Sequence, residues 1–176
     1  MNKLQSYDIA FKGLKDGVHE FEYDLDSRFF ELIEDSLISD GEIKAKVQLT
    51  KTVTLLTLIF DIKGKVHTQC DRCLDPLEIP VKYNGKLLIK FGEAYEEVSD
   101  EIIVIPHDDH AFNVAQTLYE LIGVSLPVQK THKKNGCNPE MISRLNNYGE
   151  SHHTEEEEHE IDPRWSELKK LIDKNK

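Results

Sequence analysis

Strict alternation of apolar and polar residues over residues 43–50 limits the possible folds of this chain more than any other feature. Ile43, Ala45, Val47 and Leu49 alternate with two lysines, a glutamine and a threonine. A period of two places all the apolar side chains on one face of a β-strand and all the polar ones on the other. Residues 52–60 are β-branched and apolar on both faces, and alternation returns over residues 62–70. The pattern predicts a sheet with one buried face and one solvated face.

Residues 77–91, "LEIPVKYNGKLLIKF", allow two interpretations. Asn84-Gly85 is a strong signal for a two-residue hairpin. A hairpin, however, would set Ile79 opposite Lys90. In a continuous strand, the apolar residues from Leu77 to Phe91 all share one face. Parity therefore favours one long strand with a bend or bulge near Gly85.

The second half of the chain contains helical patterns. A Glu-rich loop after residue 92 leads to a short strand at 101–106, and a helix follows with Asp109 as its expected N-cap. Residues 138–149 form a shorter helix. Residues 150–162 hold seven acidic residues and no Lys or Arg, which indicates a flexible acidic linker. Residues 163–176 form a C-terminal amphipathic helix.

Strands followed by helices indicate the α+β class. We expect a twisted, mostly antiparallel sheet of about five to seven strands, open and barrel-like, with a packed helix and a C-terminal helix. The expected organisation is an α+β core domain at 1–149, the acidic linker at 150–162 and the terminal helix at 163–176.

Charge and hydropathy limit the class of protein. The formal net charge is −11, yet residues 41–92 hold nine Lys or Arg against five Asp or Glu. Overall acidity argues against a general DNA-coating protein but allows a local basic face. The start of the chain lacks the apolar stretch of a signal peptide, and no run is long enough for a membrane helix. We therefore expect a soluble, cytoplasmic protein with reduced cysteines and no membrane contact.

The three cysteines form one candidate site. Cys70 and Cys73 end a predicted strand, and "THKKNGC" places His132 five residues before Cys137. Three thiolates and one imidazole make a Cys₃His set, which binds structural zinc in a tetrahedral site. Three reduced cysteines without a metal are an equally good interpretation. Redox catalysis requires the Cys-x-x-Cys pair at a helix N-terminus, and the pair here follows a strand.

A second candidate site is the polar face of the predicted sheet. Its lysines can follow a phosphate backbone without reading sequence, although a solvated face is the simpler interpretation. The candidate nucleic-acid-binding residues are Lys44, Lys46, Lys63, Lys65, Lys82, Lys86 and Lys90. In the terminal helix, Trp165, Leu168 and Leu171 share an apolar face that could bind a partner protein. No catalytic motif is present, and we expect no small-molecule substrate.

Several short motifs together resemble the bacterial YceD family, the large ribosomal RNA subunit accumulation proteins. They are "CDRCL", "LYELIGVSLPV" running into "HKKNGC", and the terminal "DPRWSELKKL". The resemblance covers about residue 40 to the end and implies that Cys70, Arg72, Cys73, His132 and Cys137 are family-signature residues. It further implies a non-enzymatic role in the synthesis, processing or accumulation of 23S rRNA. The long Glu-rich insert departs from the short linker expected in the family, and its charge would repel RNA.

Three hypotheses follow. The first is a ribosome-biogenesis factor that binds large-subunit rRNA or a pre-ribosomal particle, with the lysine face as the contact. The second is a protein-binding module that docks on a ribosomal protein through the terminal helix. The third is a thiol oxidoreductase that uses the Cys-x-x-Cys pair.

Overall fold

The computed structural model describes residues 3–150. The chain divides into two compact units between Cys137 and Asn138. Of the elements in the described residues, the first unit contains all the strands, together with α1 (Ser27–Phe30), α2 (Ala115–Ser125) and two 3₁₀ turns, Lys3–Tyr7 and Phe11–Gly13. The second contains α3 (Pro139–Glu150), which confirms the helix predicted at 138–149.

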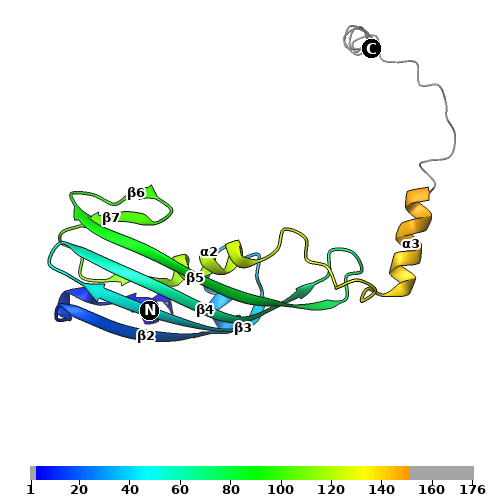
Figure 1. Ribbon diagram of the computed structural model, residues 1–176, viewed down its shortest axis with the longest axis horizontal. Helices are drawn as coiled ribbons and strands as arrows, with labels where there is room; N and C mark the ends of the chain where they lie inside the picture. Colours follow the sequence, from blue (N-terminus) through cyan, green and yellow to red (C-terminus); the bar gives the residue numbers. More distant parts are fainter. Residues whose placement is uncertain (1–2, 151–176) are drawn as a thin grey trace, which may run out of the picture. The chain divides into compact units, whose positions relative to one another are not determined.

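The main sheet has six strands in the order β2-β3-β4-β5-β7-β6 (Figure 1). These are β2 (Gly17–Leu25), β3 (Asp40–Lys51), β4 (Leu55–Gln69), β5 (Pro76–Gly92), β6 (Glu96–Ser99) and β7 (Ile102–Pro106). All neighbouring strands are antiparallel except β5 and β7, which are parallel. A separate two-stranded sheet pairs β1 (Asp8–Ile9) with β8 (Phe112–Asn113). The α+β class and the mostly antiparallel sheet are confirmed, and the sheet is open, not closed into a barrel.

The continuous strand predicted at 77–91 is confirmed as β5. Its pairing with β4 runs from Leu55–Lys90 to Gln69–Pro76 without a change of register, so it contains no bulge at Gly85. Pairing over this whole length sets apolar residues opposite one another, as in Leu56–Ile89 and Val66–Ile79. A hairpin at Asn84-Gly85 would have removed these apolar pairs from the core. Burial of these pairs therefore outweighs the preference of Asn-Gly for a hairpin turn.

One face of the sheet forms the core, as the alternation predicted. The apolar residues of β3 from Ile43 to Leu49 are all at most 2% exposed, and β4 contributes Phe60 and Ile62. The helix α2 covers this face with Leu118 and Ile122, which are fully buried (Figure 1). Burial of each such side chain stabilises the fold by about 1.5–3 kcal/mol.

β3 and β4 lie close together at Gly64, which is opposite Ile43. A Cβ atom at Gly64 would overlap the carbonyl oxygen of Glu42 and would lie 2.6 Å from the Cα of Ile43. Both neighbours are backbone atoms that cannot rotate away. Glycine is therefore needed here for a close backbone approach within the sheet.

Two local predictions were wrong. The helix α2 begins at Ala115, and Asp109 does not cap it. The N-cap is Val114, which makes no side-chain capping hydrogen bond, and the Oδ1 atom of Asn113 accepts a hydrogen bond from the Ala115 N–H at 3.0 Å. The Glu-rich segment expected to be a loop contains the strand β6, whose four residues are all exposed and which pairs with β7. A short exposed strand shows no alternation of burial, so no period of two could reveal it.

Most of the acidic linker and the whole predicted terminal helix lie outside the described residues, and so do Trp165, Leu168 and Leu171. These remain predictions. Among residues 3–150, no helix is long and apolar enough to cross a membrane.

Candidate metal centre and candidate nucleic-acid interface

The Cys-x-x-Cys pair lies in the tight turn that joins β4 to β5. The N–H of Cys70 donates to the carbonyl of Asp75, and the N–H of Leu74 donates to the carbonyl of Cys70, both at 2.9 Å. Leu74 has a positive φ of 62°, an uncommon conformation for a residue with a branched side chain. These contacts fold the turn back on itself, and both cysteine side chains are buried, at 0% and 2% exposed.

The segment after α2 brings the other two candidate ligands to this turn. The N–H of Asp71 donates to the carbonyl of Lys130 at 2.7 Å, and the N–H of Lys130 donates to the Asp71 carboxylate at 2.6 Å. This reciprocal pair of hydrogen bonds joins the two segments. His132 and Cys137 follow Lys130 and therefore lie beside Cys70 and Cys73.

The four predicted ligands converge. The sulfur atoms of Cys70, Cys73 and Cys137 and a ring nitrogen of His132 all lie within 4.8 Å of one another. The Sγ atoms of Cys70 and Cys137 are 3.9 Å apart, and the Sγ of Cys73 is 3.4 Å from the Nδ1 of His132. A tetrahedral zinc ion with Zn–S bonds of about 2.3 Å and Zn–N bonds of about 2.0–2.1 Å spaces two sulfurs by about 3.8 Å and a sulfur and nitrogen by about 3.6 Å. These two distances therefore fit a tetrahedral metal ion.

The other ring nitrogen of His132 also has a partner. Nε2 lies 3.1 Å from the carbonyl oxygen of Pro76, the first residue of β5. A carbonyl can only accept, so this contact places the proton on Nε2 and leaves the Nδ1 lone pair directed at the sulfur atoms. Metal-binding histidines commonly have such a second partner, which fixes the tautomer.

Local hydrogen bonding makes one of the thiols easy to ionise. Burial raises the pKa of Cys70, but the backbone N–H groups of Cys73, Arg72 and His132 stabilise its thiolate and bring the pKa down to about 6. Burial raises the pKa of Cys137. The Pro76 carbonyl raises the pKa of His132 by accepting a hydrogen bond from its Nε2–H, which stabilises the protonated ring. A metal ion needs deprotonated ligands, and a thiolate already stabilised at Cys70 is a suitable first ligand.

A low thiol pKa is also a property of redox cysteines, but the surroundings of this pair differ from theirs. The pair follows the strand β4 and precedes β5, and no helix begins at it. Both sulfurs belong to buried residues, so a protein disulfide could not easily reach them. The arrangement can hold a metal between two loops more readily than it can exchange disulfides.

The seven predicted lysines lie on the exposed side of the sheet, on β3, β4 and β5. Strand pairing aligns Lys44, Lys63 and Lys82 in one row across the three strands. Neighbouring strands are about 4.8 Å apart, so this row concentrates positive charge over about 10 Å.

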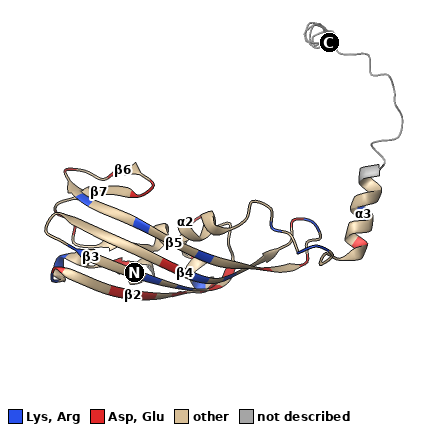
Figure 2. Cartoon of the chain, in the orientation of Figure 1, with Lys and Arg blue, Asp and Glu red and all other residues tan. Residues whose placement is uncertain are grey.

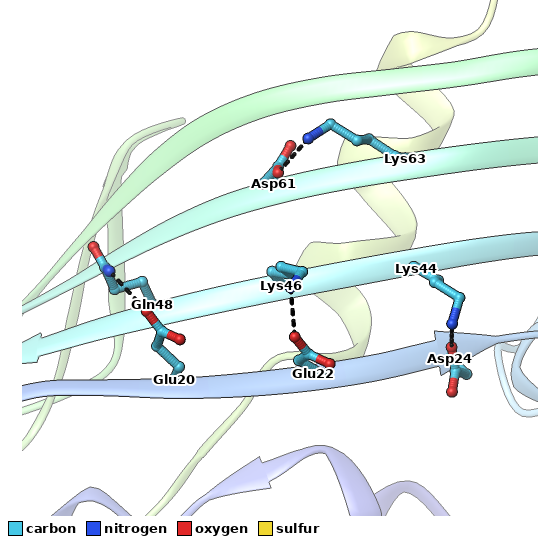
Figure 3. Close-up of polar contacts among 8 residues, drawn as sticks. All are labelled: Glu20, Glu22, Asp24, Lys44, Lys46, Gln48, Asp61 and Lys63. Carbon is cyan, nitrogen blue, oxygen red and sulfur yellow. Dashed lines mark hydrogen bonds and ion pairs between the residues drawn. The ribbon is translucent and has the colours of Figure 1, made fainter.

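Acidic side chains accompany the lysines on β3 and β4. Lys44 pairs with Asp24 at 3.4 Å, Lys46 pairs with Glu22 at 2.6 Å and Lys63 pairs with Asp61 at 2.6 Å (Figure 3). Lys65 contacts both Glu78 and Glu42. Sequence reasoning missed the acidic partners on β2. Their signal was the alternation of Glu20, Glu22 and Asp24, which places three carboxylates on one face of a neighbouring strand.

The lysines of β5 differ from those of β3 and β4. Lys82, Lys86 and Lys90 are exposed, and within residues 3–150 none of them forms an ion pair. Charge across the exposed face therefore changes from acidic on β2, through paired charges on β3 and β4, to unpaired lysines on β5. The part of this face best able to attract an anion lies on β5.

Comparison with known proteins identifies a family. The family model described as "Large ribosomal RNA subunit accumulation protein YceD" matches residues 58–172, a range that includes all four converging Cys and His residues. No curated protein and no solved structure matches the chain.

Proposed function

Since this chain belongs to the YceD family of large ribosomal RNA subunit accumulation proteins, we propose that it is a non-enzymatic factor in the biogenesis of the large ribosomal subunit. It would act in the cytoplasm and promote the synthesis, processing or accumulation of 23S rRNA. Family membership is the observation on which this function rests. The buried, metal-compatible arrangement of the cysteines agrees with a structural role for them.

The exposed face of β5 is the proposed contact with rRNA or with a pre-ribosomal particle. Lys82, Lys86 and Lys90 are four residues apart, so they follow one another along the strand at intervals of about 13 Å. They are the lysines of the face that form no ion pair with the described residues, so binding a phosphate would not require breaking one. Lysines that contact phosphates provide affinity without sequence selectivity.

Charge reversal tests this contact. Lys86→Glu/Lys90→Glu should weaken binding of the protein to a large-subunit rRNA transcript and flatten its salt dependence by roughly 0.7–0.9 per lost phosphate contact. Lys12→Glu/Lys15→Glu makes the same change of charge on exposed residues outside the face and serves as the control. Equal binding by the two double variants would show that the β5 face is not the contact.

A structural zinc ion is proposed at Cys70, Cys73, His132 and Cys137. It would join the β4–β5 turn to the segment after α2, and it would take no part in a reaction. Elemental analysis of the purified protein should find about one zinc per chain, and Cys137→Ser should lose it. A protein purified without metal, and unable to take up zinc, would support the alternative that the cysteines are simply reduced.

Docking of the terminal helix on a ribosomal protein is the second candidate function. It rests on the apolar face of Trp165, Leu168 and Leu171 in the sequence. Removing residues 163–176 should abolish capture of a ribosomal protein and leave RNA binding intact if this candidate is correct. Loss of RNA binding in the same variant would place the RNA contact in the terminal helix instead.

A further inference from the structure

A second group of cations lies at the end of the sheet, around the Cys and His cluster. Arg72 stands between the two cysteines of the β4–β5 turn, and Lys133 and Lys134 stand between His132 and Cys137. All three side chains are exposed. None of them forms an ion pair with any residue from 3 to 150. Figure 2 shows basic segments both in the β4–β5 turn and in the segment that follows α2. We call these three residues the cationic tip.

The geometry of the cluster determines the positions of these cations. Arg72 directly precedes Cys73, and Lys133 directly follows His132, while the Cys73 Sγ and the His132 Nδ1 are only 3.4 Å apart. The N–H of Asp71 and the carbonyl of Lys130 bring the same two segments together at 2.7 Å. Arg72 therefore comes from a segment that is about 60 positions away in sequence from the segment of the two lysines, and the cluster holds these two segments side by side.

The local charge favours an anionic partner. Residues 70–76 contain one Arg and two Asp, and residues 127–137 contain three Lys and no acidic residue, which together give a net charge of +2. The Asp71 carboxylate is already engaged by the Lys130 N–H at 2.6 Å. The chain has a net charge of −11, so a locally positive tip is opposite in sign to the protein as a whole, and such patches concentrate polyanions.

Apolar side chains accompany the cations. Leu74, in the same turn as Arg72, is 60% exposed, and Val128, two residues before Lys130, is 99% exposed. Base-paired RNA hides the faces of its bases, whereas unpaired loops and ends offer them to apolar side chains and to the plane of an Arg guanidinium. Cations for the phosphates and exposed apolar groups for the bases fit an unpaired strand better than a duplex.

We propose that the cationic tip, with Leu74 beside it, binds single-stranded segments of RNA. This rests on the proposed function in rRNA biogenesis and adds a contact surface distinct from the lysines of β5. The tip would bind an exposed loop or end of the large-subunit rRNA, while the β5 face contacts phosphates of neighbouring helices.

The test compares two matched double variants of the full chain. Lys133→Gln/Lys134→Gln removes two charges from the tip, and Lys12→Gln/Lys15→Gln removes two exposed charges elsewhere. The probe is a fluorescent single-stranded RNA of about a dozen nucleotides, a length within the range that one binding module covers. Two lost phosphate contacts should weaken binding about 25-fold at about 0.1 M salt and reduce the slope of log K against log salt by about 1.4. The control variant should bind like the unmodified chain.

Substitution of Arg72 provides an independent test of the proposal. Arg72→Lys keeps the charge but loses the planar guanidinium, so it should weaken binding to the single strand more than binding to the same RNA annealed with its complement. None of these substitutions changes a cluster residue, and equal thermal unfolding midpoints would show that the fold is intact.

The outcomes separate this inference from the proposed function. If the chain binds a large-subunit rRNA transcript but the tip variant and the control variant bind the short RNA equally, the tip proposal is wrong and the β5 contact stands. A preference of the tip for duplex RNA would overturn it as well. If the unmodified chain binds neither RNA, then direct RNA contact at both surfaces is excluded.

Discussion

Metal removal should destabilise the protein by an amount that follows from the separation of the ligands in sequence. A zinc ion that binds Cys73 and His132 connects residues 59 positions apart. In the chain-entropy description of a cross-link, closing a loop of that size removes about 4 kcal/mol of conformational freedom from the unfolded state. We therefore expect chelation to lower the free energy of unfolding by about 4 kcal/mol, provided that the zinc ion stays bound to both segments in the unfolded chain.

The corresponding change in melting temperature is measurable. For a chain of this length, 1 kcal/mol corresponds to a shift of roughly 2–4 °C, so chelation should lower the midpoint by roughly 8–16 °C. The assay is thermal unfolding followed by circular dichroism on zinc-loaded protein, with and without chelator. His132→Ala should melt at the chelated midpoint whether or not zinc is added. His110→Ala changes an exposed histidine outside the cluster and should keep the full response to zinc.

One result would refute this reasoning directly. If elemental analysis shows that the metal has been removed and the midpoint changes by less than about 2 °C, the cluster does not connect the two segments energetically. The four residues would then be near one another because other contacts, such as the Asp71–Lys130 hydrogen bonds, hold the segments together without a metal.

Three further predictions concern the sheet and its ends. Gly64→Ala should destabilise the fold by about 3 kcal/mol, because the new Cβ would overlap the backbone of β3. Gly13→Ala is its control, since a Cβ there meets no atom within 4 Å. Equal denaturation midpoints for the two variants would contradict the close approach of β3 and β4. Asn113→Ala should cost about 1–2 kcal/mol, because the Ala115 N–H at the start of α2 would lose its hydrogen-bond acceptor. Urea unfolding measures this cost, and an unchanged midpoint would show that this hydrogen bond is dispensable. The hydrogen bond from His67 holds the pKa of Asp40 below its usual value. The stabilisation from this hydrogen bond should therefore be complete above about pH 4, and it should be lost as the pH falls through the lower pKa of Asp40 in the folded state. Asp40→Asn should reduce this loss of stability on acidification, and an unchanged pH profile would exclude the contribution.

The sequence alone predicted where the long strands lie and which face of the sheet is buried. Alternation around Ala45 and Val47 depends only on the geometry of a single strand, in which successive side chains point to opposite faces. The same parity decided between a hairpin and the continuous β5, because each apolar residue had to reach the core. Ligand chemistry likewise indicated which Cys and His residues could converge, since zinc accepts few kinds of side chain.

Other features depended on contacts between segments far apart in the chain. No local pattern revealed that β7 would add to β5 in parallel with β6 outside it, because such pairing is decided by packing against the rest of the sheet. The start of α2 depended on a similar contact: β8 pairs with β1 as far as Asn113, so the helix begins only after this residue, with Val114 at its N-cap.

The distribution of charge on the sheet shows most clearly what the sequence predicts and what depends on tertiary contacts. Alternation in the sequence put all seven lysines on the exposed face, but it could not tell which of them would have an acidic neighbour. The pairing of β2 with β3 sets Glu22 opposite Lys46 and Asp24 opposite Lys44, whereas β5 has no such acidic strand beside its lysines. Periodicity is a property of one strand, while the neighbour of a charge is set by register between strands. The sequence alone therefore determined which face is charged, and only the tertiary structure decided where on that face the positive charge is left unpaired.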